Sequence, residues 1–254
     1  MDYDVIIIGA TFTAAGLVKA YGNRCLVLER RPQAGYEFLN AINFGTDYDT
    51  PLKSCEAKEL YTKFKEKDAF DGERLCLFSC AELLYRIFEG NNIMLNMEII
   101  SINKAEDGYE VTAHGVSGWR TFTAKKIIDT TVRSEMIEEK SLNILVNADK
   151  ETELILPENI KAETKRWGYE GDTLIKCFVD KDANYIAGRS QVANVIEQLP
   201  KEYKVALVAD SFDHAVKPGY PKVENGILYI SSCGYKNPLL AFDAGVVYGK
   251  GGVL

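Results

Sequence analysis

The chain has 254 residues, of which 46% are hydrophobic and 26% charged, so it can bury one large core or two smaller ones. This composition argues against global disorder, and the net charge of −7 argues against nucleic acid or an anionic membrane surface as the main partner. The only apolar run near the N-terminus, Val5 to Ile8, is too short to cross a bilayer and follows acidic residues. We therefore expect a cytoplasmic protein without a membrane segment.

Cysteine and histidine usage gives no metal-binding pattern. The six cysteines are scattered along the chain, at positions 25, 55, 76, 80, 177 and 233. Cys76 and Cys80 have no second pair nearby, and His114 and His214 are isolated. We expect reduced thiols and predict no metal site.

The first thirty residues predict a strand, a glycine turn, a helix and a second strand. The β-branched run from Asp4 to Ile8 ends at Gly9, as a buried parallel strand would. Residues 13–21 have helical composition, and the apolar strand 25–28 is closed by Glu29. This order is that of a βαβ unit, the opening of a nucleotide-binding fold.

The glycine turn of this unit departs from the pattern G-x-G-x-x-G, because Gly9, Thr11 and Ala14 stand at the three glycine positions. The Cβ of Thr11 points into the space of a phosphate, although its hydroxyl could donate to one at the helix N-terminus. Glu29 follows Gly9 by 20 residues, the spacing at which a carboxylate accepts hydrogen bonds from ribose hydroxyls. The alternative is a purely structural loop, with Glu29 a solvated charge.

Further elements follow from periodicity and turn residues. We expect helices at 55–64, at 79–88 with Ser79 as N-cap, and at 185–199; strands at 93–103, 109–113, 120–123, 126–130, 142–146, 173–179, 204–209 and 226–230; and a turn at Asp71-Gly72. Residues 93–123 have the pattern of a β-meander, and Asn237-Pro238 opens a last helix. The region from Ser134 to Gly219 is typical of a separate antiparallel layer.

The order of these elements, with "IIDTT" at 127–131 and "NGILYISSCGYKNPLLAFDAGVVYG" at 225–249, resembles the FAD-dependent oxidoreductases of the glutathione-reductase-like superfamily. The resemblance covers roughly residues 1–45, 75–132 and 222–250. It implies an α/β fold: a Rossmann-like FAD-binding domain with a β-meander crossover, plus a smaller α+β inserted domain. We expect the FAD-binding domain at 1–133 and 220–254, and a substrate or partner domain at 134–219.

The resemblance also implies a set of FAD-binding positions on the glycine turn, the strand ends and the last helix: Gly9, Thr11, Ala14, Glu29, Arg30, Ile99, Thr130, Ser232, Cys233, Pro238 and Leu239. The three positions of the turn would face the pyrophosphate. Glu29 would hold the adenosine ribose, Arg30 would lie beside the adenine, and Ile99 would contact the adenine through its backbone.

Two side chains are candidates for chemistry at the flavin. Cys233 lies before the last helix, whose dipole would favour a thiolate; the alternative is a small buried cysteine that fills space. Asn43, in "NAINFG", would approach the ring, and the alternative is a turn residue. Asn237 as N-cap and Pro238 at the first helical position would set a helix start whose positive end stabilises reduced flavin.

The predicted function is that of an FAD-dependent oxidoreductase, with hydride or electron transfer through the flavin to or from a small organic substrate. A protein partner as electron donor or acceptor stays open. The first alternative is a non-catalytic nucleotide-fold subunit or binding module that has lost its cofactor, which Thr11, Cys233 and the brevity of the chain favour. The second alternative is an NAD(P)-binding protein. The meander and the late strand–helix element favour FAD over NAD(P).

Overall fold

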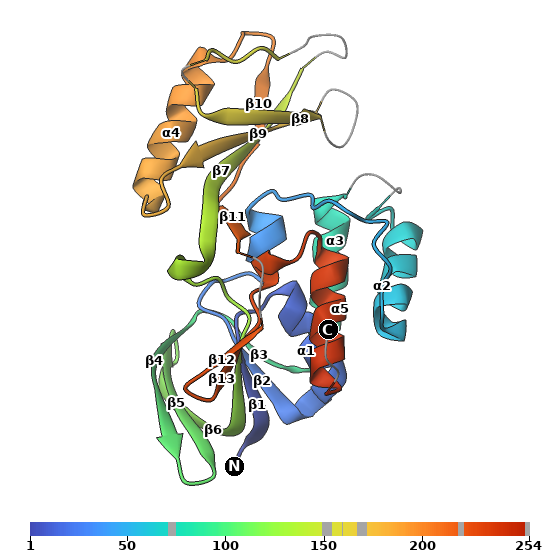
Figure 1. Ribbon diagram of the computed structural model, residues 1–254, viewed down its shortest axis with the longest axis vertical. Coiled ribbons are helices and arrows are strands. Elements are labelled where there is room, and N and C mark those ends of the chain that lie inside the picture. Colours follow the sequence, from blue (N-terminus) through green and yellow to red (C-terminus); the bar gives the residue numbers. More distant parts are fainter. Residues whose placement is uncertain (71–74, 149–153, 159, 167–171, 218–220, 252–254) are drawn as a thin grey trace.

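The computed structural model describes residues 1–70, 75–148, 154–158, 160–166, 172–217 and 221–251. Within these residues, the strands form two sheets. Figure 1 shows the first sheet and most helices in the lower half of the molecule, and the second sheet with one helix in the upper half. The expected turn at Asp71-Gly72 lies outside the described residues. The chain therefore has an α/β architecture with a mixed, largely parallel sheet and a second sheet.

Five parallel strands form the centre of the first sheet, in the order β13-β6-β1-β2-β3. Their bounds are β1 (Tyr3–Ile8), β2 (Cys25–Leu28), β3 (Asn92–Met94), β6 (Gly118–Asp129) and β13 (Ile227–Tyr229), and β12 (Lys222–Glu224) is an antiparallel edge strand. Val5 and Ile7 of β1 pack in the core under the helices, whereas Ile6 packs in a second core against the meander. Both faces of β1 are covered, which explains its unbroken apolar sequence.

The expected meander consists of β4 (Met97–Ala105), β5 (Gly108–Gly115) and the first half of β6. Two boundaries differ from the prediction. Strands 120–123 and 126–130 are one strand, β6, because no turn residue separates them; its first half pairs with β5 and its second half with β1. The predicted strand 93–103 is two strands, because Asn96 adopts a left-handed φ of 55° between β3 and β4.

Two helices, α1 (Phe12–Tyr21) and α5 (Pro238–Gly249), pack against each other at very short range. A Cβ added at Gly16 would lie 2.1 Å from the carbonyl oxygen of Phe242, and one added at Gly245 would lie 2.0 Å from that of Thr13. Only glycine permits this backbone contact. It places the N-terminus of α1 beside the segment that precedes α5.

The remaining helices of this layer are α2 (Cys55–Glu66) and α3 (Leu77–Phe88). The N-cap of α3 is Cys76 rather than the predicted Ser79. Ser79 belongs to the first turn of the helix, and its hydroxyl donates to Cys76 Sγ at 3.5 Å. Short helical turns occur at η1 (Gly22–Arg24), η2 (Tyr36–Asn40), η3 (Ser134–Met136) and η4 (Ser232–Gly234). The predicted start of α5 is confirmed: Asn237 accepts a hydrogen bond from Leu240 N at 2.9 Å, and Pro238 is the first helical residue.

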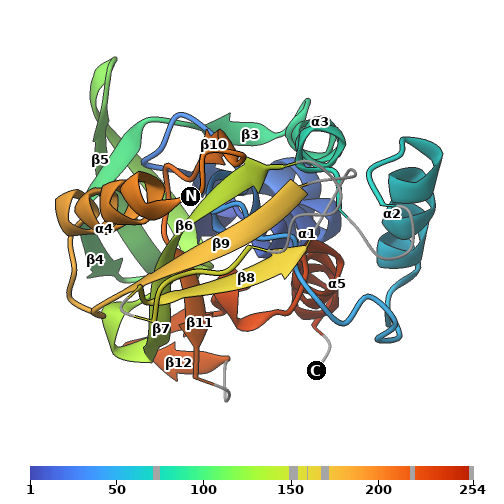
Figure 2. The same ribbon diagram turned by 90° about the horizontal axis from the view of Figure 1, so that it is seen from above.

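The second sheet is antiparallel, in the order β10-β7-β9-β8, with β11 also pairing with β7. Its strands are β7 (Ile137–Asn147), β8 (Ala162–Arg166), β9 (Asp172–Val179), β10 (Lys204–Val208) and β11 (Asp213–Val216), and α4 (Tyr185–Gln198) packs on it. Figure 2 shows β7, β9 and β8 side by side. The sequence did not predict β8, β11 or β12, which are short and polar. The domain boundaries at 134 and 219 stay a prediction.

Within the described residues, no helix combines the length and the apolar character that crossing a membrane requires.

Candidate functional site

A cavity of about 430 Å³ opens at the carboxyl ends of β1, β2 and β6. We call it the edge cavity; it is lined by Ile8, Gly9, Leu28, Glu29, Arg30, Arg31, Tyr36, Met97, Glu98, Ile99, Thr131, Val132, Ser134, Ile137, Lys140, Phe212 and His214. β2, the next strand in the sequence, pairs with one side of β1, and β6 pairs with the other side. Ligands of doubly wound sheets bind at such a switch point, and the volume is that of a small-molecule site.

Glu29 lies at the end of β2 and lines this cavity, although its exposed fraction is only 2%. Its Oε2 accepts a hydrogen bond from Ala10 N at 2.9 Å, and its Oε1 accepts one from Arg31 N at 2.8 Å. Each carboxylate oxygen keeps a further lone pair. The carboxylate is thus held in a fixed position from which it can still accept hydroxyl hydrogens.

Three other predicted positions lie around the same cavity: Gly9, Arg30 and Ile99. Gly9 adopts a φ of 88°, and a Cβ at this position would lie 2.7 Å from Thr131 Cγ2. The requirement for glycine therefore comes in part from the chain's own packing. The structure therefore brings together at this cavity one residue of the predicted glycine turn, Gly9, and the three residues predicted for the adenosine end, Glu29, Arg30 and Ile99.

The first turn of α1 lies beside the cavity, and its backbone amides have partners from the chain itself. Phe12 N donates to Glu37 Oε1 at 2.8 Å, and Thr13 N donates to Ser232 Oγ at 3.3 Å. Ala14 N donates to the hydroxyl of Thr11 at 3.1 Å. These are the donors with which a helix N-terminus of this fold would hold phosphate.

Glu37 is the site residue that the sequence analysis missed. It lies on the π-helical turn η2, and its exposed fraction is 2%. Besides Phe12 N, its Oε1 accepts a hydrogen bond from Ser232 Oγ at 2.7 Å. Burial raises the pKa of the Glu37 carboxyl to about 7, against the lowering effect of these two hydrogen bonds. No local signal in "AGYEFLN" indicates this role, since its partners lie far away in the sequence.

The hydroxyl of Thr11 is used within the fold. Thr11 is the N-cap of α1 and is fully buried; it donates to Thr130 Oγ1 at 2.8 Å. Thr130 in turn donates to the carbonyl oxygen of Ile8 at 2.8 Å. Neither threonine lines the edge cavity. The two residues tie the end of β6 to the start of α1, and the place of Thr11 at the pyrophosphate stays a prediction.

Ser232 and Cys233 lie on η4, where the sequence placed them near the flavin. Ser232 is buried and joins Glu37 to Thr13 N. Burial raises the pKa of the Cys233 thiol well above its ordinary value, and the neighbouring Glu37 carboxylate adds to the rise. The environment therefore favours the neutral thiol, which fits the packing interpretation of Cys233 rather than the nucleophilic one.

Ala14, Pro238 and Leu239 are buried helix residues. Ala14 belongs to the first turn of α1, and the other two open α5. None of the three lines the edge cavity. Their part in holding FAD stays a prediction.

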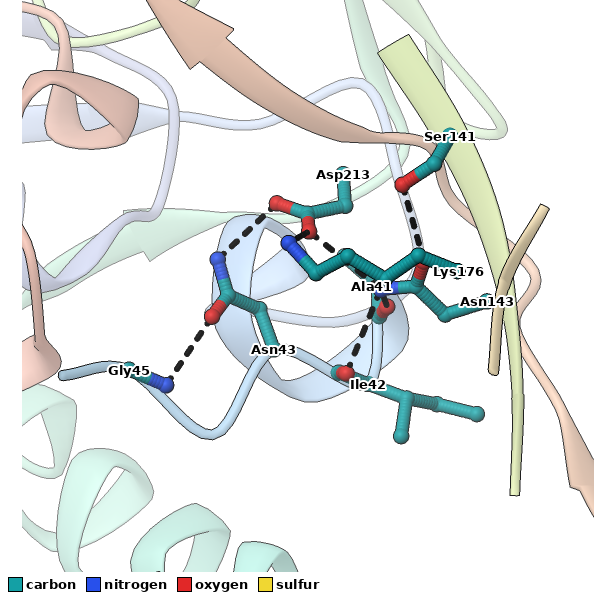
Figure 3. Close-up of polar contacts among 8 residues, drawn as sticks. All are labelled: Ala41, Ile42, Asn43, Gly45, Ser141, Asn143, Lys176 and Asp213. Carbon is teal, nitrogen blue, oxygen red and sulfur yellow. Dashed lines mark hydrogen bonds and ion pairs between the residues drawn. The ribbon is translucent and has the colours of Figure 1, made fainter. Parts of the chain in front are cut away.

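Asn43 belongs to a polar network between the loop after η2 and the second sheet (Figure 3). Asp213, at the start of β11 and 5% exposed, accepts hydrogen bonds from Asn43 Nδ2 at 2.9 Å, Lys176 Nζ at 2.8 Å and Asn143 Nδ2 at 3.3 Å. Asn143 also donates to the carbonyl oxygen of Ala41 at 2.9 Å. We call these four polar side chains the Asp213 network.

This arrangement places Asn43 in a junction rather than free to turn towards a ligand. Its Oδ1 accepts a hydrogen bond from Gly45 N at 2.9 Å, so both ends of the amide are used. Ile42 beside it adopts a left-handed φ of 50°, which a β-branched residue rarely does. The Asp213 network holds this strained loop, and the loop follows directly on the turn that carries Glu37.

The end of the edge cavity near the second sheet is lined by Phe212, His214 and Lys140. Burial lowers the pKa of His214 to about 4, although the Asp213 carboxylate opposes this shift. The imidazole is therefore neutral near pH 7. Lys140 lies 4.2 Å from the ring centre of Phe212, and Arg31 lies 3.8 Å from that of Tyr36. This end combines aromatic rings with cations.

No protein-family model matches this sequence, and no curated protein matches it. Solved structures with the same fold do. The anhydrotetracycline hydroxylase OxyS from Streptomyces rimosus superposes with a TM-score of 0.63 at 16% identity, over 98% of this chain and 61% of the hydroxylase. The p-nitrophenol 4-monooxygenase from Pseudomonas putida DLL-E4 superposes with a TM-score of 0.59 at 14% identity, over 98% of this chain and 77% of the monooxygenase.

A third structure is a ternary complex of aklavinone-11 hydroxylase with FAD and aklavinone, with a TM-score of 0.53 at 10% identity, over 97% of this chain and 60% of that enzyme. At these identities the comparison shows the fold, which the chain shares with two hydroxylases and a monooxygenase, one of them in complex with FAD. The chain spans about three fifths of the length of OxyS. The α/β expectation for a flavoprotein-like fold is confirmed at this level.

Proposed function

We propose that the chain binds FAD and is an oxidoreductase that acts on a small organic substrate. The observation that carries the proposal is the edge cavity: it lies at the switch point of a flavoprotein fold, with the Glu29 carboxylate fixed at the end of β2. The finer assignment to the glutathione-reductase-like superfamily, with a substrate domain at 134–219, belongs to the same proposal.

The residues of the cavity fit the adenosine end of FAD. Glu29 would accept hydrogen bonds from the ribose hydroxyls, Arg30 would lie beside the adenine, and the backbone of Ile99 would contact its edge. The first turn of α1 fits the pyrophosphate only when the Glu37 carboxylate has left Phe12 N. When bound, FAD would supply hydride or single-electron transfer, and the protein would supply position and electrostatics.

At the other end of the cavity, this chain's own groups favour a ligand with an aromatic or anionic part. Phe212 presents a ring, and Lys140 and Arg31 present positive charge. His214, with its lowered pKa, is a neutral hydrogen-bonding group there. A protein partner as electron donor or acceptor, and the cytoplasmic location, stay predictions.

A second candidate function is a binding module without a cofactor. The observation in its favour is the first turn of α1, where Glu37, Ser232 and Thr11 already satisfy the amides that would hold phosphate. A protein that never binds a dinucleotide has no need to leave these donors free.

The two functions are separated by the visible spectrum of the protein after incubation with FAD and gel filtration. Two flavin bands that stay with the protein support the FAD enzyme. A colourless protein that also leaves the fluorescence of added FAD unchanged supports the module and overturns the proposal.

A further inference from the structure

The N-terminus of α1 is occupied by a carboxyl group of the chain itself. Glu37 reaches it from the turn η2, with Oε1 at 2.8 Å from Phe12 N and 2.7 Å from Ser232 Oγ. A helix N-terminus carries a partial positive charge and free N–H groups, and these bind carboxylates and phosphates in the same way. The Glu37 carboxylate therefore uses the contacts that a phosphate would use.

Glu37 does not use the full hydrogen-bonding capacity of this position. Among the described residues, its Oε2 and the hydroxyl oxygen of Thr13 are buried and have no partner. Both residues are almost completely covered. Buried polar atoms are nearly always paired, and the Thr13 hydroxyl is a buried donor that lacks an acceptor at this helix terminus. A group that brings one more acceptor oxygen than Glu37 Oε1 would satisfy it.

We propose that Glu37 closes the diphosphate position of this fold in the ligand-free protein, and that a nucleotide diphosphate ester binds there by displacing its carboxylate. The inference rests on the proposed function, in which FAD is that ester. It adds a competition between an internal carboxylate and the ligand, which the fold alone does not imply.

The segment that carries Glu37 has a fixed point on each side. Before it, Gly35 adopts a φ of 75° and its amide donates to the carbonyl oxygen of Ala10 at 2.7 Å. After it, the Asp213 network holds Asn43. Displacement therefore means a change within the short turn η2, or of the Glu37 side chain alone, while both flanks stay in place.

The test compares three ligands that share the adenosine part: adenosine, ADP and FAD. Their dissociation constants are measured for the wild type, Glu37→Gln and Glu37→Ala. Glu110→Gln is the matched control, because it removes the same charge from an exposed position on β5. Without the internal carboxylate, ADP and FAD should bind about tenfold to a hundredfold more tightly, since a charge-assisted hydrogen bond no longer has to be broken. The affinity for adenosine should be the same in the wild type and the Glu37 variants, and Glu110→Gln should bind all three ligands as the wild type does.

The outcomes separate this inference from the proposed function. Equal FAD affinity for the wild type and both Glu37 variants overturns the inference and leaves the function standing. Tighter ADP binding in the variants, with no FAD binding to any of them, supports the inference and overturns FAD as the cofactor. If neither diphosphate binds any variant, both are overturned.

If neither Glu37→Gln nor Glu37→Ala folds, the proton release on FAD binding to the wild type tests the inference instead. The buried carboxyl, whose pKa is raised to about 7, is faced by Glu29, Tyr36, Cys80 and Cys233. Once displaced into water it would ionise at its ordinary pKa, so FAD binding at pH 6.5 should release about half a proton or more. Titration calorimetry in two buffers of different ionisation enthalpy measures this release, and its absence overturns the inference.

Discussion

The Glu37 Oε1 atom lies 2.8 Å from the backbone nitrogen of Phe12, so the chain supplies its own carboxyl group to the N-terminus of α1. The contact joins a turn, a helix and, through Ser232, the loop before α5.

The Glu37 carboxyl should make stability fall as the pH rises. Its pKa is raised to about 7 in the folded chain, whereas in the unfolded chain it is near the ordinary value of about 4.3. The folded state thus holds the proton more strongly. The stabilisation is complete below the unfolded pKa and is lost as the pH rises through the folded pKa, by up to about 4 kcal/mol.

Denaturant unfolding of the wild type and Glu37→Gln between pH 5 and pH 8 measures this effect. The wild type should lose stability relative to the variant over that range, and Glu110→Gln should follow the wild type. A difference between wild type and Glu37→Gln that is constant with pH would show that Glu37 does not titrate there.

Replacing Glu29 by alanine should weaken FAD binding by about 1–3 kcal/mol, because ribose hydroxyls in the cavity lose their acceptor. The same change removes the acceptor of Ala10 N, so the free energy of unfolding is measured beside the affinity. Titration of the flavin fluorescence gives the dissociation constant. An affinity equal to that of the wild type removes Glu29 from the binding site.

Thr11 should stabilise the fold as the N-cap of α1. Thr11→Ala leaves Ala14 N without its partner and should cost about 1 kcal/mol of unfolding free energy. Thr11→Ser keeps the hydroxyl and should stay close to the wild type. Thermal and denaturant unfolding of the two variants is the measurement. Equal loss in both would show that the methyl group, and not the hydroxyl, is what the fold requires.

Cys233 should react slowly with alkylating reagents at neutral pH, because burial and the Glu37 carboxylate raise its thiol pKa. A variant that keeps only Cys233 is compared with one that keeps only Cys55, which is exposed. Cys233→Ala should cost about 1 kcal/mol of stability or less. A Cys233 reaction rate that already levels off between pH 6 and 7 would indicate a thiolate and would return Cys233 to the catalytic candidates.

Asn43 should stabilise the junction with the second sheet. Asn43→Ala removes one of the donors to the buried Asp213 carboxylate and should cost about 1–3 kcal/mol. Asn43→Asp should cost more, because it sets two carboxylates against each other. Denaturant unfolding checks both, and Ser190→Ala on the exposed face of α4 is the control. Unchanged stability of Asn43→Ala would show that the hydrogen bond to Asp213 contributes nothing to the fold.

The sequence predicts the parts of this structure that depend on neighbouring residues. The βαβ unit follows from the β-branched run of β1, the turn at Gly9 and the apolar β2, and the start of α5 follows from Asn237 and Pro238. The place of Glu29 at the end of β2 follows from its spacing from Gly9, which reflects the length of α1 and β2. All these signals lie within short stretches of chain.

The contacts that the sequence does not predict join residues that are distant from one another in the chain. Glu37 meets Ser232 across 195 positions, and Asn43 meets Asp213 across 170. A π-helical turn has no recognisable composition, so nothing in residues 36–40 indicates a carboxylate aimed at α1. Nor does the sequence show that the Thr11 hydroxyl donates to Thr130 Oγ1 and accepts a hydrogen bond from Ala14 N.

The most direct test of this account is an equilibrium titration of the purified wild-type protein and Glu37→Gln with FAD, followed by flavin fluorescence and absorbance. We expect saturable one-to-one binding of FAD to both proteins, with the tighter binding to Glu37→Gln. Absence of binding to both would contradict the proposed cofactor, and equal affinities would contradict the displacement of Glu37.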